Sequence, residues 1–465
     1  MNQPLYSFYG DDFTGSTDVL EGLSLAGVRS VLFLGPPSEK HFAKFSDCQA
    51  FGIAGDSRSR SPEWMDENLP AVFERLRSFG APVVHYKTCS TFDSSPRAGS
   101  IGRAMEIGHR ILPSAFVPVV VAAPHLRRFV VFGNLFAAAG AGVYRIDRHP
   151  TMSRHPVTPL HEADLRVHLA AQTRMRIGLI DLPTLQSGRA EEILSARIKS
   201  GDQAVVFDGV ERREADEVGR ILWRVAHQTP LFAVGSSGLT YGLTSAWRAG
   251  NAIAVINTAS RAQATDRLLV MSGSCSPVTE WQIAHALRNG YTGIDIAALA
   301  HPAAPTQPAP LAQPAALTQP TALAHQAFAN PAAHASEAAR TVIRQASQAL
   351  QQTGKVVVYS SLGPLPTGTD ARGDALGQAM GAMLREIIQA TGVRRVVLAG
   401  GDTSSHAVAQ LGLYALTWAA PTEPGAPLCR ARSDTPALDG LELVLKGGQV
   451  GSDDFFERVR LGLTD

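Results

Sequence analysis

The stretch that decides the fold stands near the start of the chain, where residues 5–18 read LYSFYGDDFTGSTD. A short apolar run, rich in the aromatic side chains that strands favour, passes directly into a turn of Gly, Asp, Thr and Ser. Residues 14–26 after this turn carry the apolar spacing of a helix. A strand that runs through a polar turn into a helix is typical of a parallel α/β sheet.

The same alternation of apolar runs and amphipathic stretches recurs along the chain. In the first 250 residues, we expect strands at Leu5–Tyr9, Ser30–Leu34, Gln49–Ala54, Val83–Lys87, Phe116–Ala122, Arg176–Ile180, Ala204–Phe207 and Leu231–Val234. A second series is expected at residues 268–271, Tyr291–Ile296, Lys355–Tyr359, Arg395–Ala399 and Leu441–Leu445. The expected helices include Thr14–Ala26, Ala215–His227 and Ser336–Gln351.

These two series predict an α/β protein of two lobes, each a mainly parallel sheet flanked by helices. The domains are expected at residues 1–250 and 251–465, with the join around Trp247–Thr265. We expect the active site in the cleft between the lobes. Between them, His301–Ala335 hold 13 Ala, 7 Pro and 4 Gln and no charged residue, so an insertion at about 300–336 is predicted to be a mobile surface excursion.

The composition argues against several classes of protein. The 42 basic and 41 acidic residues of the 465 give a net charge of +1, which argues against nucleic acid or a membrane surface as a partner. The four cysteines are far apart, so neither a zinc knuckle nor a disulfide framework is expected. No secretory signal is visible, and prolines interrupt the most apolar window, Ile111–Phe132. We therefore expect a cytoplasmic protein.

Two adjacent carboxylates, Asp11 and Asp12, stand at the end of the first expected strand, with Thr14 close behind. Open α/β sheets bind ligands at the carboxyl ends of their strands. A single Asp there is accounted for by capping of the next helix. A repelling pair needs a cation, a hydrogen-bond donor or water to share the site, which favours a polar-ligand or metal site.

A second polar segment, HYKTCSTFDSSP at residues 85–96, follows another expected strand. Its Lys87 suits the carboxylate of a hydroxy acid, and Ser90 and Asp93 suit the hydroxyls. The alternative is a Ser/Thr-rich loop that satisfies its own backbone. The basic, proline-stiffened segment 147–159 adds Arg154 and His155 as anion-binding candidates, or else is a loop that merely packs.

Three glycine- and hydroxyl-rich turns follow strands in the second half of the chain. They read MSGSCSPVT at 271–279, VVLAGGDTSS at 396–405 and LKGGQVGSDDFF at 445–456. Open backbone N–H groups at helix starts bind anions, so three such turns favour a nucleotide phosphate site. None fits the P-loop pattern or the dinucleotide fingerprint GxGxxG.

In their order and spacing, these segments resemble the four-carbon acid sugar kinase family. The resemblance rests on DDFTG at 11–15, SGSCS at 272–276, GGDTS at 400–404 and KGGQVG at 446–451. Asp402 stands where the family usually has Glu, and KGGQVG departs from the family's KSGNFG at three positions. CSTFDS at 89–94 looks like the branch that acts on 3-oxo acids, although RAGSIG at 97–102 and residues 147–153 depart from that branch.

The resemblance implies an N-terminal sugar-acid-binding domain and a C-terminal nucleotide-binding domain that use ATP and Mg²⁺. The implied substrate is a small 3-oxo acid such as 3-oxo-tetronate or 3-oxo-isoapionate, phosphorylated on a hydroxyl. The expected substrate-binding residues are Asp11, Thr14, Lys87, Ser90, Arg154 and His155. The expected nucleotide-binding residues are Ser272, Ser274, Ser276, Gly400, Gly401, Asp402, Thr403, Lys446, Gly448 and Gly451.

Several alternatives stay open at this point. Either Asp12 or Asp93 could orient or deprotonate the acceptor hydroxyl, and Asp402 could orient the surroundings of Mg²⁺. A D-threonate or D-erythronate kinase is the nearest other activity. A hydroxy-acid dehydrogenase, a lyase or a sugar-acid receptor without catalytic activity is a more distant one. The sequence does not decide the oligomeric state, for which a homodimer is one option.

Overall fold

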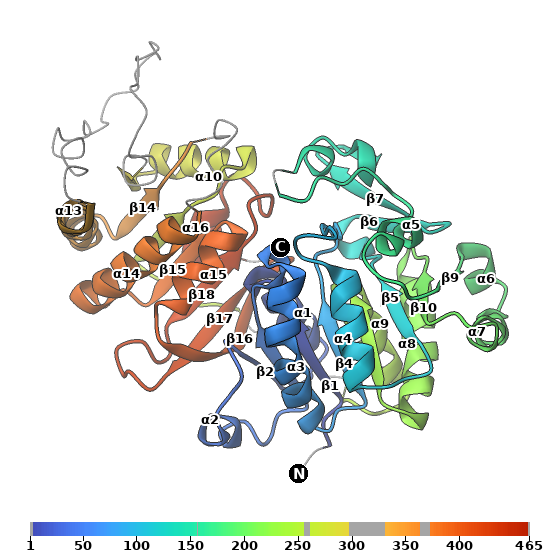
Figure 1. The fold of residues 1–465 in the computed structure, drawn as a ribbon. Coiled ribbons are helices and arrows are strands. Elements are labelled where there is room, and N and C mark those ends of the chain that lie inside the picture. The colour runs from blue at the N-terminus through green and yellow to red at the C-terminus, as the bar shows by residue number, and fades with distance from the viewer. Residues whose placement is uncertain (1–2, 156, 255–260, 297–330, 363–372, 464–465) are drawn as a thin grey trace. The chain divides into compact units, whose positions relative to one another are not determined.

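A computed structural model of the chain describes residues 3–155, 157–254, 261–296, 331–362 and 373–463, without the side chains of 331–336, 373–374 and 402 (Figure 1). The chain forms two compact units. The first is Met1–Ala259 with Ala415–Trp418, and the second is Ser260–Tyr414 with Ala419–Asp465. Most of the Ala/Pro-rich insertion lies outside the described residues.

The first unit is built on a parallel sheet in the order β2-β3-β1-β4-β11-β5-β10-β9. Its strands are β1 (Tyr6–Gly10), β2 (Ser30–Phe33), β3 (Ala50–Ala54), β4 (Val83–Lys87), β5 (Val117–Val120), β9 (Ile177–Ile180), β10 (Ala204–Phe207) and β11 (Leu231–Gly235). Its helices are α1 (Phe13–Leu25), α2 (Glu39–Ala43), α3 (Pro62–Ser78), α4 (Ile101–Ile111), α5 (Leu165–Ala170), α6 (Leu182–Gln186), α7 (Ala190–Lys199), α8 (Arg212–Gln228) and α9 (Ser237–Ala249).

The strands of this sheet are apolar because helices cover them. Every residue of β1, β3, β4 and β11 is buried, as expected for a parallel sheet with two covered faces. The helices begin where the sequence supplies caps. The side chain of Asp12 accepts a hydrogen bond from Gly15 N–H at the start of α1, and Ser100 caps α4 through Arg103 N–H.

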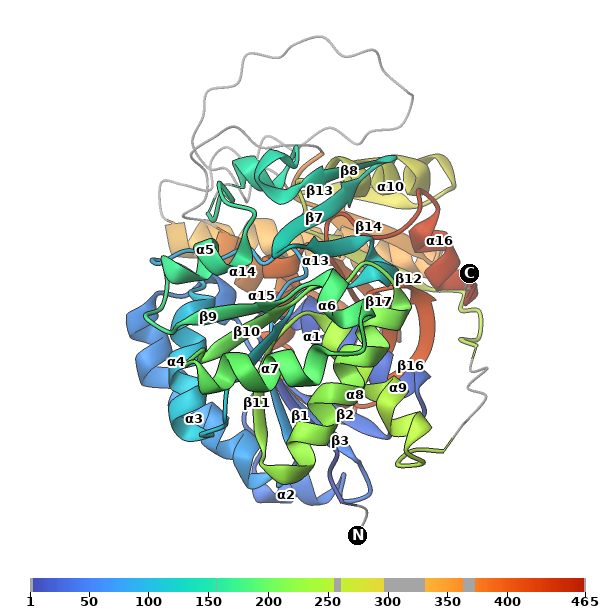
Figure 2. The ribbon, with the colours of Figure 1, turned by 90° about the vertical axis from the view of Figure 1, so that its right-hand side faces the viewer.

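A small antiparallel sheet, absent from the predicted elements, interrupts the first unit. Its strands are β6 (Arg128–Val131), β7 (Asn134–Ala139) and β8 (Gly142–Arg145). Phe132 and Gly133 join β6 to β7 with positive φ angles of 50° and 80°, the conformation of a tight hairpin turn. Figures 1 and 2 show this sheet at the end of the unit opposite the N-terminus.

The second unit has five parallel strands in the order β13-β14-β12-β15-β18, followed by antiparallel β17 and then β16. Its strands are β12 (Leu268–Ser272), β13 (Thr292–Asp295), β14 (Lys355–Tyr359), β15 (Arg395–Ala399), β16 (Leu413–Glu423), β17 (Ala426–Ser433) and β18 (Glu442–Lys446). Its helices are α10 (Pro277–Arg288), α13 (Pro331–Gln352), α14 (Gly373–Thr391), α15 (Gly401–Ala409) and α16 (Phe455–Leu461). Residues 415–418 of β16 belong to the first unit, where Ala415 and Leu416 pair with β2.

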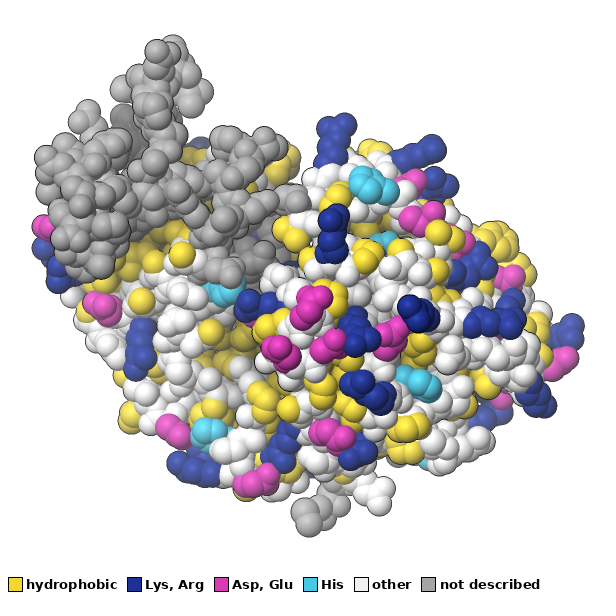
Figure 3. All heavy atoms as spheres, in the orientation of Figure 1, with side chains coloured by type: hydrophobic (Ala, Val, Ile, Leu, Met, Phe, Trp, Pro, Cys, Tyr) yellow, Lys and Arg dark blue, Asp and Glu magenta, His cyan; other side chains and the backbone are white. Residues whose placement is uncertain are grey.

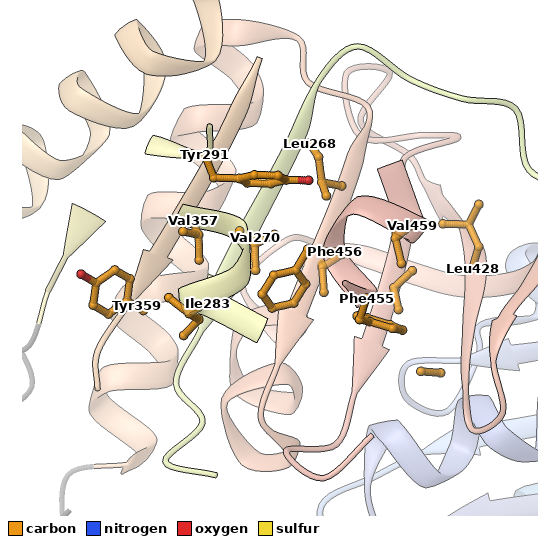
Figure 4. Packing of buried hydrophobic residues seen from close by; sticks show 14 of the residues in the cluster. Leu268, Val270, Ile283, Tyr291, Val357, Tyr359, Leu428, Phe455, Phe456 and Val459 are labelled. Carbon is orange, nitrogen blue, oxygen red and sulfur yellow. The ribbon is translucent and has the colours of Figure 1, made fainter. Parts of the chain in front are cut away.

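One face of the second sheet packs against α10 and α16. Figure 4 shows Val270 of β12 and Val357 of β14 in the same cluster as Ile283 of α10 and Phe455 of α16, and all four are fully buried. Burial of such side chains stabilises the unit and fixes α10 and α16 against the strands. The turns that lead into these helices are thereby held in place.

The predicted fold class is confirmed: both units are α/β, with mainly parallel sheets flanked by helices. The position of the active site in an inter-lobe cleft stays a prediction. Among the described residues, no helix is both long and apolar enough to cross a membrane. Basic and acidic side chains are interspersed on the face shown in Figure 3, in keeping with the near-zero net charge.

Candidate active site

Four polar turns of the first unit meet at one edge of its sheet. The register aligns Gly10 at the end of β1 with Ala54 of β3 and with Lys87 of β4, and aligns Lys87 with Gly235 of β11. Backbone hydrogen bonds link the ends: Asp11 N–H donates to Lys87 C=O at 2.9 Å. The turns after β1, β3, β4 and β11 therefore lie side by side, where open α/β sheets bind ligands.

Two of the predicted site residues, Asp12 and Lys87, approach each other at Gly15. A Cβ on Gly15 would lie 2.5 Å from Asp12 Oδ1 and 2.6 Å from Lys87 Nζ. Lys87 is 2% exposed, yet in the described part of the chain no hydrogen bond or ion pair joins its ammonium to another group. A buried ammonium without a partner is costly, so this position favours an anionic ligand.

Arg58, on a short 3₁₀ helix at Ser57–Ser59, stands between the two predicted catalytic aspartates. Its Nη2 is 3.0 Å from Asp12 Oδ2, and its Nε is 4.0 Å from Asp93 Oδ2. Thr91 Oγ1 donates to Asp93 Oδ1 at 2.5 Å. Burial raises the pKa of Asp93, but the charge of Arg58 and the Thr91 hydrogen bond outweigh it and hold this pKa below its ordinary value.

Asp11 is a different kind of acid in the same cluster. Burial and the neighbouring charge of Asp12 raise the pKa of Asp11 to about 8, although Arg58 and Lys87 oppose the shift. Its Oδ1 is buried without a hydrogen-bond partner in the described residues, and so are the hydroxyls of Thr14 and Thr88. Buried polar atoms are normally hydrogen-bonded, so these three oxygens suit a polar ligand or ordered water.

The remaining predicted substrate residues are less closely placed. His155 lies near enough to Asp93 for its charge to help lower the pKa of that carboxyl, and its own ring bonds to Thr158. Arg154 is exposed at the end of a 3₁₀ helix, and no contact among the described residues joins its side chain to the acid cluster. Ser90 is half-buried in the turn after β4.

The three predicted turns of the second unit pack against one another. A Cβ on Gly273 would lie 2.1 Å from Thr403 Oγ1, and one on Gly448 would lie 2.7 Å from Ser274 Oγ. Gly400 N–H donates to Lys446 C=O at 3.0 Å. These close approaches bring the turns after β12, β15 and β18 into one cluster.

Two helices start in this cluster. α10 begins at Ser276, whose Oγ accepts from Val278 N–H. α15 begins after Gly400, which has a φ of 113° and supplies no side-chain cap, so the first N–H groups of α15 keep their bonding capacity for a ligand. Gly401 opens α15, whereas the side chain of Asp402 lies outside the described residues.

Lys446 belongs to the same cluster, but its ammonium points into the protein. Its Nζ donates to Thr279 Oγ1 at 3.0 Å and lies 5.9 Å from the centroid of the Phe455 ring. Burial lowers the pKa of Lys446 to about 7. Gln282 donates to the carbonyls of Val450, Gly451 and Ser452, which fastens the rest of this turn to α10.

Comparison with known proteins assigns the two units. Residues 6–243 match the family model of a sugar-binding N-terminal domain, and residues 269–456 match that of a nucleotide-binding C-terminal domain. The chain belongs to the four-carbon acid sugar kinase family.

Named relatives of this kinase family cover nearly the whole chain. The chain is 42% identical to a 3-oxo-isoapionate kinase of Paraburkholderia graminis, over 98% of this chain and 94% of the relative. It is 30% identical to a 3-oxo-tetronate kinase of Pseudomonas savastanoi, over 98% and 96%. A crystal structure of the Haemophilus influenzae protein HI1011 superimposes with a TM-score of 0.67 at 22% identity, over 98% and 99% of the two chains, which shows a shared fold.

The predicted function class is thereby confirmed: the chain is a kinase, an ATP-dependent phosphotransferase acting on a sugar acid. Because the chain belongs to this kinase family, the alternative functions of a dehydrogenase, a lyase or a receptor no longer apply. No finding tests the roles of the single residues, which stay predictions.

Sequence reasoning missed Arg58 and His168 of this kinase. Arg58 lies in GDSRSRS at 55–61, a polar run directly after the buried strand β3, which was the available signal. His168 Nε2 lies 2.8 Å from Ser94 Oγ and anchors the turn after β4. Burial lowers the pKa of His168 to about 4, so this histidine is neutral near pH 7. No motif in its helix pointed to this contact.

Proposed function

We propose that this kinase transfers the γ-phosphoryl group of ATP to a hydroxyl of a 3-oxo sugar acid, with 3-oxo-isoapionate as the first candidate. The identity of 42% to a 3-oxo-isoapionate kinase, against 30% to a 3-oxo-tetronate kinase over the same share of the chain, supports this order of candidates. The nearly fully buried Lys87 side chain at the end of β4, whose ammonium has no hydrogen-bond or ion-pair partner among the described residues, is the structural observation that carries the proposal.

The carboxylate of the acid binds to Lys87 in this proposal. An ammonium in a buried site pairs strongly with a carboxylate, because little water competes for either charge. The hydroxyls of Thr14 and Thr88, which have no hydrogen-bond partner in the described part of the chain, are available to the hydroxyl groups of the acid. Arg154 and Ser90 remain candidates for binding the part of the sugar acid that lies away from Lys87.

Asp93 is a better candidate than Asp12 for the group that accepts a hydrogen bond from the substrate hydroxyl. Both oxygens of Asp12 are engaged, one by Gly15 N–H at 2.9 Å and the other by Arg58 at 3.0 Å. Asp93 has one oxygen bound to Thr91, whereas its Oδ2 lies 4.0 Å from Arg58, beyond hydrogen-bond distance. Asp93 Oδ2 can therefore accept a hydrogen bond from a hydroxyl.

In the proposed phosphoryl transfer, one bond to phosphorus forms, one bond to phosphorus breaks and one proton is transferred. The substrate oxygen forms a bond to the γ-phosphorus, the bond from that phosphorus to the β–γ bridging oxygen breaks, and ADP leaves. The hydroxyl proton passes to Asp93 and then to solvent. Because phosphoryl transfer has a loose transition state, Asp93 acts mainly by orienting the hydroxyl, and its low pKa is no obstacle.

The nucleotide binds to the clustered turns of the second unit in this proposal. The α and β phosphates lie against the N–H groups at the start of α15 and close to the N-terminus of α10, where helix dipoles favour negative charge. Ser272, Ser274 and Ser276 shape this turn through hydrogen bonds from Ser274 N–H, Ser276 N–H and Val278 N–H. The buried Lys446 side chain supports these clustered turns from the protein interior.

Mg²⁺ enters with the nucleotide. This ion keeps several waters and binds through substrate phosphates and one or two carboxylates, so it does not require a protein cage. The described residues include no group of three His, Cys, Asp or Glu side chains that could hold a metal ion. Its contribution would be to neutralise charge on the transferred phosphoryl group.

A coupled assay of ADP release tests the proposal. Wild-type protein is given ATP, Mg²⁺ and, in turn, 3-oxo-isoapionate, 3-oxo-tetronate, D-threonate or D-erythronate. We expect the highest kcat/KM with a 3-oxo acid and a much lower value for Lys87→Met with the same acid. Turnover of D-threonate or D-erythronate in preference to both 3-oxo acids would contradict the proposed substrate class.

A further inference from the structure

Arg58 is a cation shared by several carboxylates, and it reaches them from a separate strand. Its side chain is 20% exposed, and the side chains of Asp12 and Asp93 are 9% and 6% exposed. Asp12 follows β1 and Asp93 follows β4, whereas Arg58 follows β3. A single guanidinium therefore lies between acids from two other turns of the sheet edge.

The turn that carries Arg58 is fastened on both sides. Arg58 N–H donates to Asp11 C=O at 3.1 Å, and Ser57 Oγ lies 2.9 Å from the hydroxyl of Tyr86 on β4. Gly99 N–H donates to Arg60 C=O at 2.8 Å, and a Cβ on Gly99 would lie 2.4 Å from Arg58 C=O. The backbone of Arg58 thus has a fixed position relative to both acid-bearing turns.

The fixed position of Arg58 matters because the charges of three aspartates act on its guanidinium. Asp11, Asp12 and Asp93 act on the same guanidinium, and although burial opposes it, their charges raise the pKa of Arg58. Without this cation, Asp12 would lose the ion pair at its Oδ2, and Asp93 would lose the positive charge that lies 4.0 Å from its own Oδ2. A guanidinium presents its N–H groups in a rigid fork, so it sets direction as well as charge, which the single ammonium of a lysine does not.

We propose that Arg58 is a positioning residue of the phosphoryl transfer: its guanidinium holds Asp12 through an ion pair at 3.0 Å, and its charge, 4.0 Å from Asp93 Oδ2, orients that carboxylate beside the substrate hydroxyl. The inference rests on the proposed function, since it assigns Arg58 to that same reaction. Arg58 acts through the two aspartates, and Lys87 remains the group for the substrate carboxylate. Loss of Arg58 should lower kcat more than it weakens the binding of either substrate.

The test compares Arg58→Ala, Arg58→Lys and the matched control Arg60→Ala. Arg60 stands two residues along the same turn but pairs with Asp56, at a distance of 3.0 Å from its Nε. With the acid that wild-type protein turns over best, we expect Arg58→Ala to lower kcat by about 100-fold, the effect of a displaced catalytic group. The KM for ATP should stay within about threefold, because the nucleotide turns lie in the other unit.

Two further readouts separate positioning from mere stability. Guanidinium ion at a non-denaturing concentration should restore part of the kcat of Arg58→Ala and none of that of Asp93→Ala. Arg58→Lys keeps the charge without the fork, so its kcat should lie between those of wild type and Arg58→Ala. If Arg58→Ala does not fold, Arg58→Lys and its KM values carry the test.

The results that would contradict the role of Arg58 differ from the result that would contradict the proposed function. Near-wild-type kcat in Arg58→Ala or Arg58→Lys overturns the inference, as does an equal loss in Arg60→Ala. A loss that guanidinium does not reverse also overturns it, because the role would then be structural. If wild-type protein turns over none of the acids, the proposed function fails before Arg58 is tested.

Discussion

At the scale of single residues, Gly15 leaves the space that Asp12 and Lys87 share. Gly15→Ala places a methyl group within 2.6 Å of both Asp12 Oδ1 and Lys87 Nζ, closer than real Cβ atoms approach. We expect at least a tenfold loss in kcat/KM for the sugar acid, about 1.4 kcal/mol of transition-state stabilisation. Steady-state kinetics at saturating ATP measures this loss.

Gly35→Ala is the matched control for this substitution. Gly35 lies in the same unit, after β2, with no atom within 4 Å of a Cβ built on it. Its kinetics should equal those of wild type. Equal kinetics for Gly15→Ala would show that Lys87 and Asp12 need not approach each other for catalysis.

The two aspartates give a second test at this scale. Because Asp93 has the less engaged oxygen, Asp93→Asn should lower kcat by about 10²–10⁴-fold, the range for loss of a proton-accepting group. Asp12→Asn should lower kcat less, since its amide oxygen can still accept from Gly15 N–H, although its amide NH₂ cannot replace the oxygen that pairs with Arg58. A larger loss in Asp12→Asn than in Asp93→Asn would reverse the two roles.

These residues also show the reach of sequence reasoning at the site. Asp11, Asp12, Lys87 and Asp93 could be proposed as site candidates because each ends or follows a recognisable strand and belongs to a conspicuous polar segment. Arg58 could not be assigned, because its role depends on β3 lying next to β1 in the sheet, and strand order is not written in the local pattern.

At the scale of elements, the parallel strands were predictable and the antiparallel ones were not. A strand buried on both faces is a continuous apolar run, and β4, β10, β14 and β15 match the predicted ranges. The strands β8, β16 and β17 carry polar or exposed residues between apolar ones, so periodicity alone did not find them. The strands β6 and β7 contain short apolar runs, but these lie beside the proline-interrupted window and were not predicted as strands.

The packed turns of the second unit give a prediction at this scale. Gly273→Ala would force its methyl group against the side chain of Thr403, 2.1 Å from Oγ1 and 2.8 Å from Cγ2, and so push the turns after β12 and β15 apart. We expect the Kd for ATP to rise at least about tenfold. Calorimetric titration with a non-hydrolysable ATP analogue measures the change, with Gly35→Ala again as control. An unchanged Kd would remove this contact from the nucleotide site.

At the scale of the whole molecule, the net charge of +1 agrees with a protein that holds its anions in local sites. In the proposed function, one anionic group lies against Lys87 and the phosphates lie against helix starts, so no broad basic face is required. Both proposed sites lie at the carboxyl ends of parallel strands, one in each unit. In this proposal, the same sheet architecture serves two different substrates.

The buried Lys446 couples the stability of the second unit to pH. Its folded-state pKa of about 7 lies below the value of about 10.4 for an exposed lysine, so between these values the unfolded chain binds a proton that the folded chain has lost. The free energy of unfolding should therefore rise with pH across this window, by up to about 1.4 kcal/mol per pH unit, and this contribution is lost as the pH falls through about 7. Lys446→Met should lack this rise. Urea unfolding of wild type, Lys446→Met and Lys199→Met, the replacement of an exposed lysine, at several pH values measures it, and an equal slope in wild type and Lys446→Met would place the proton elsewhere.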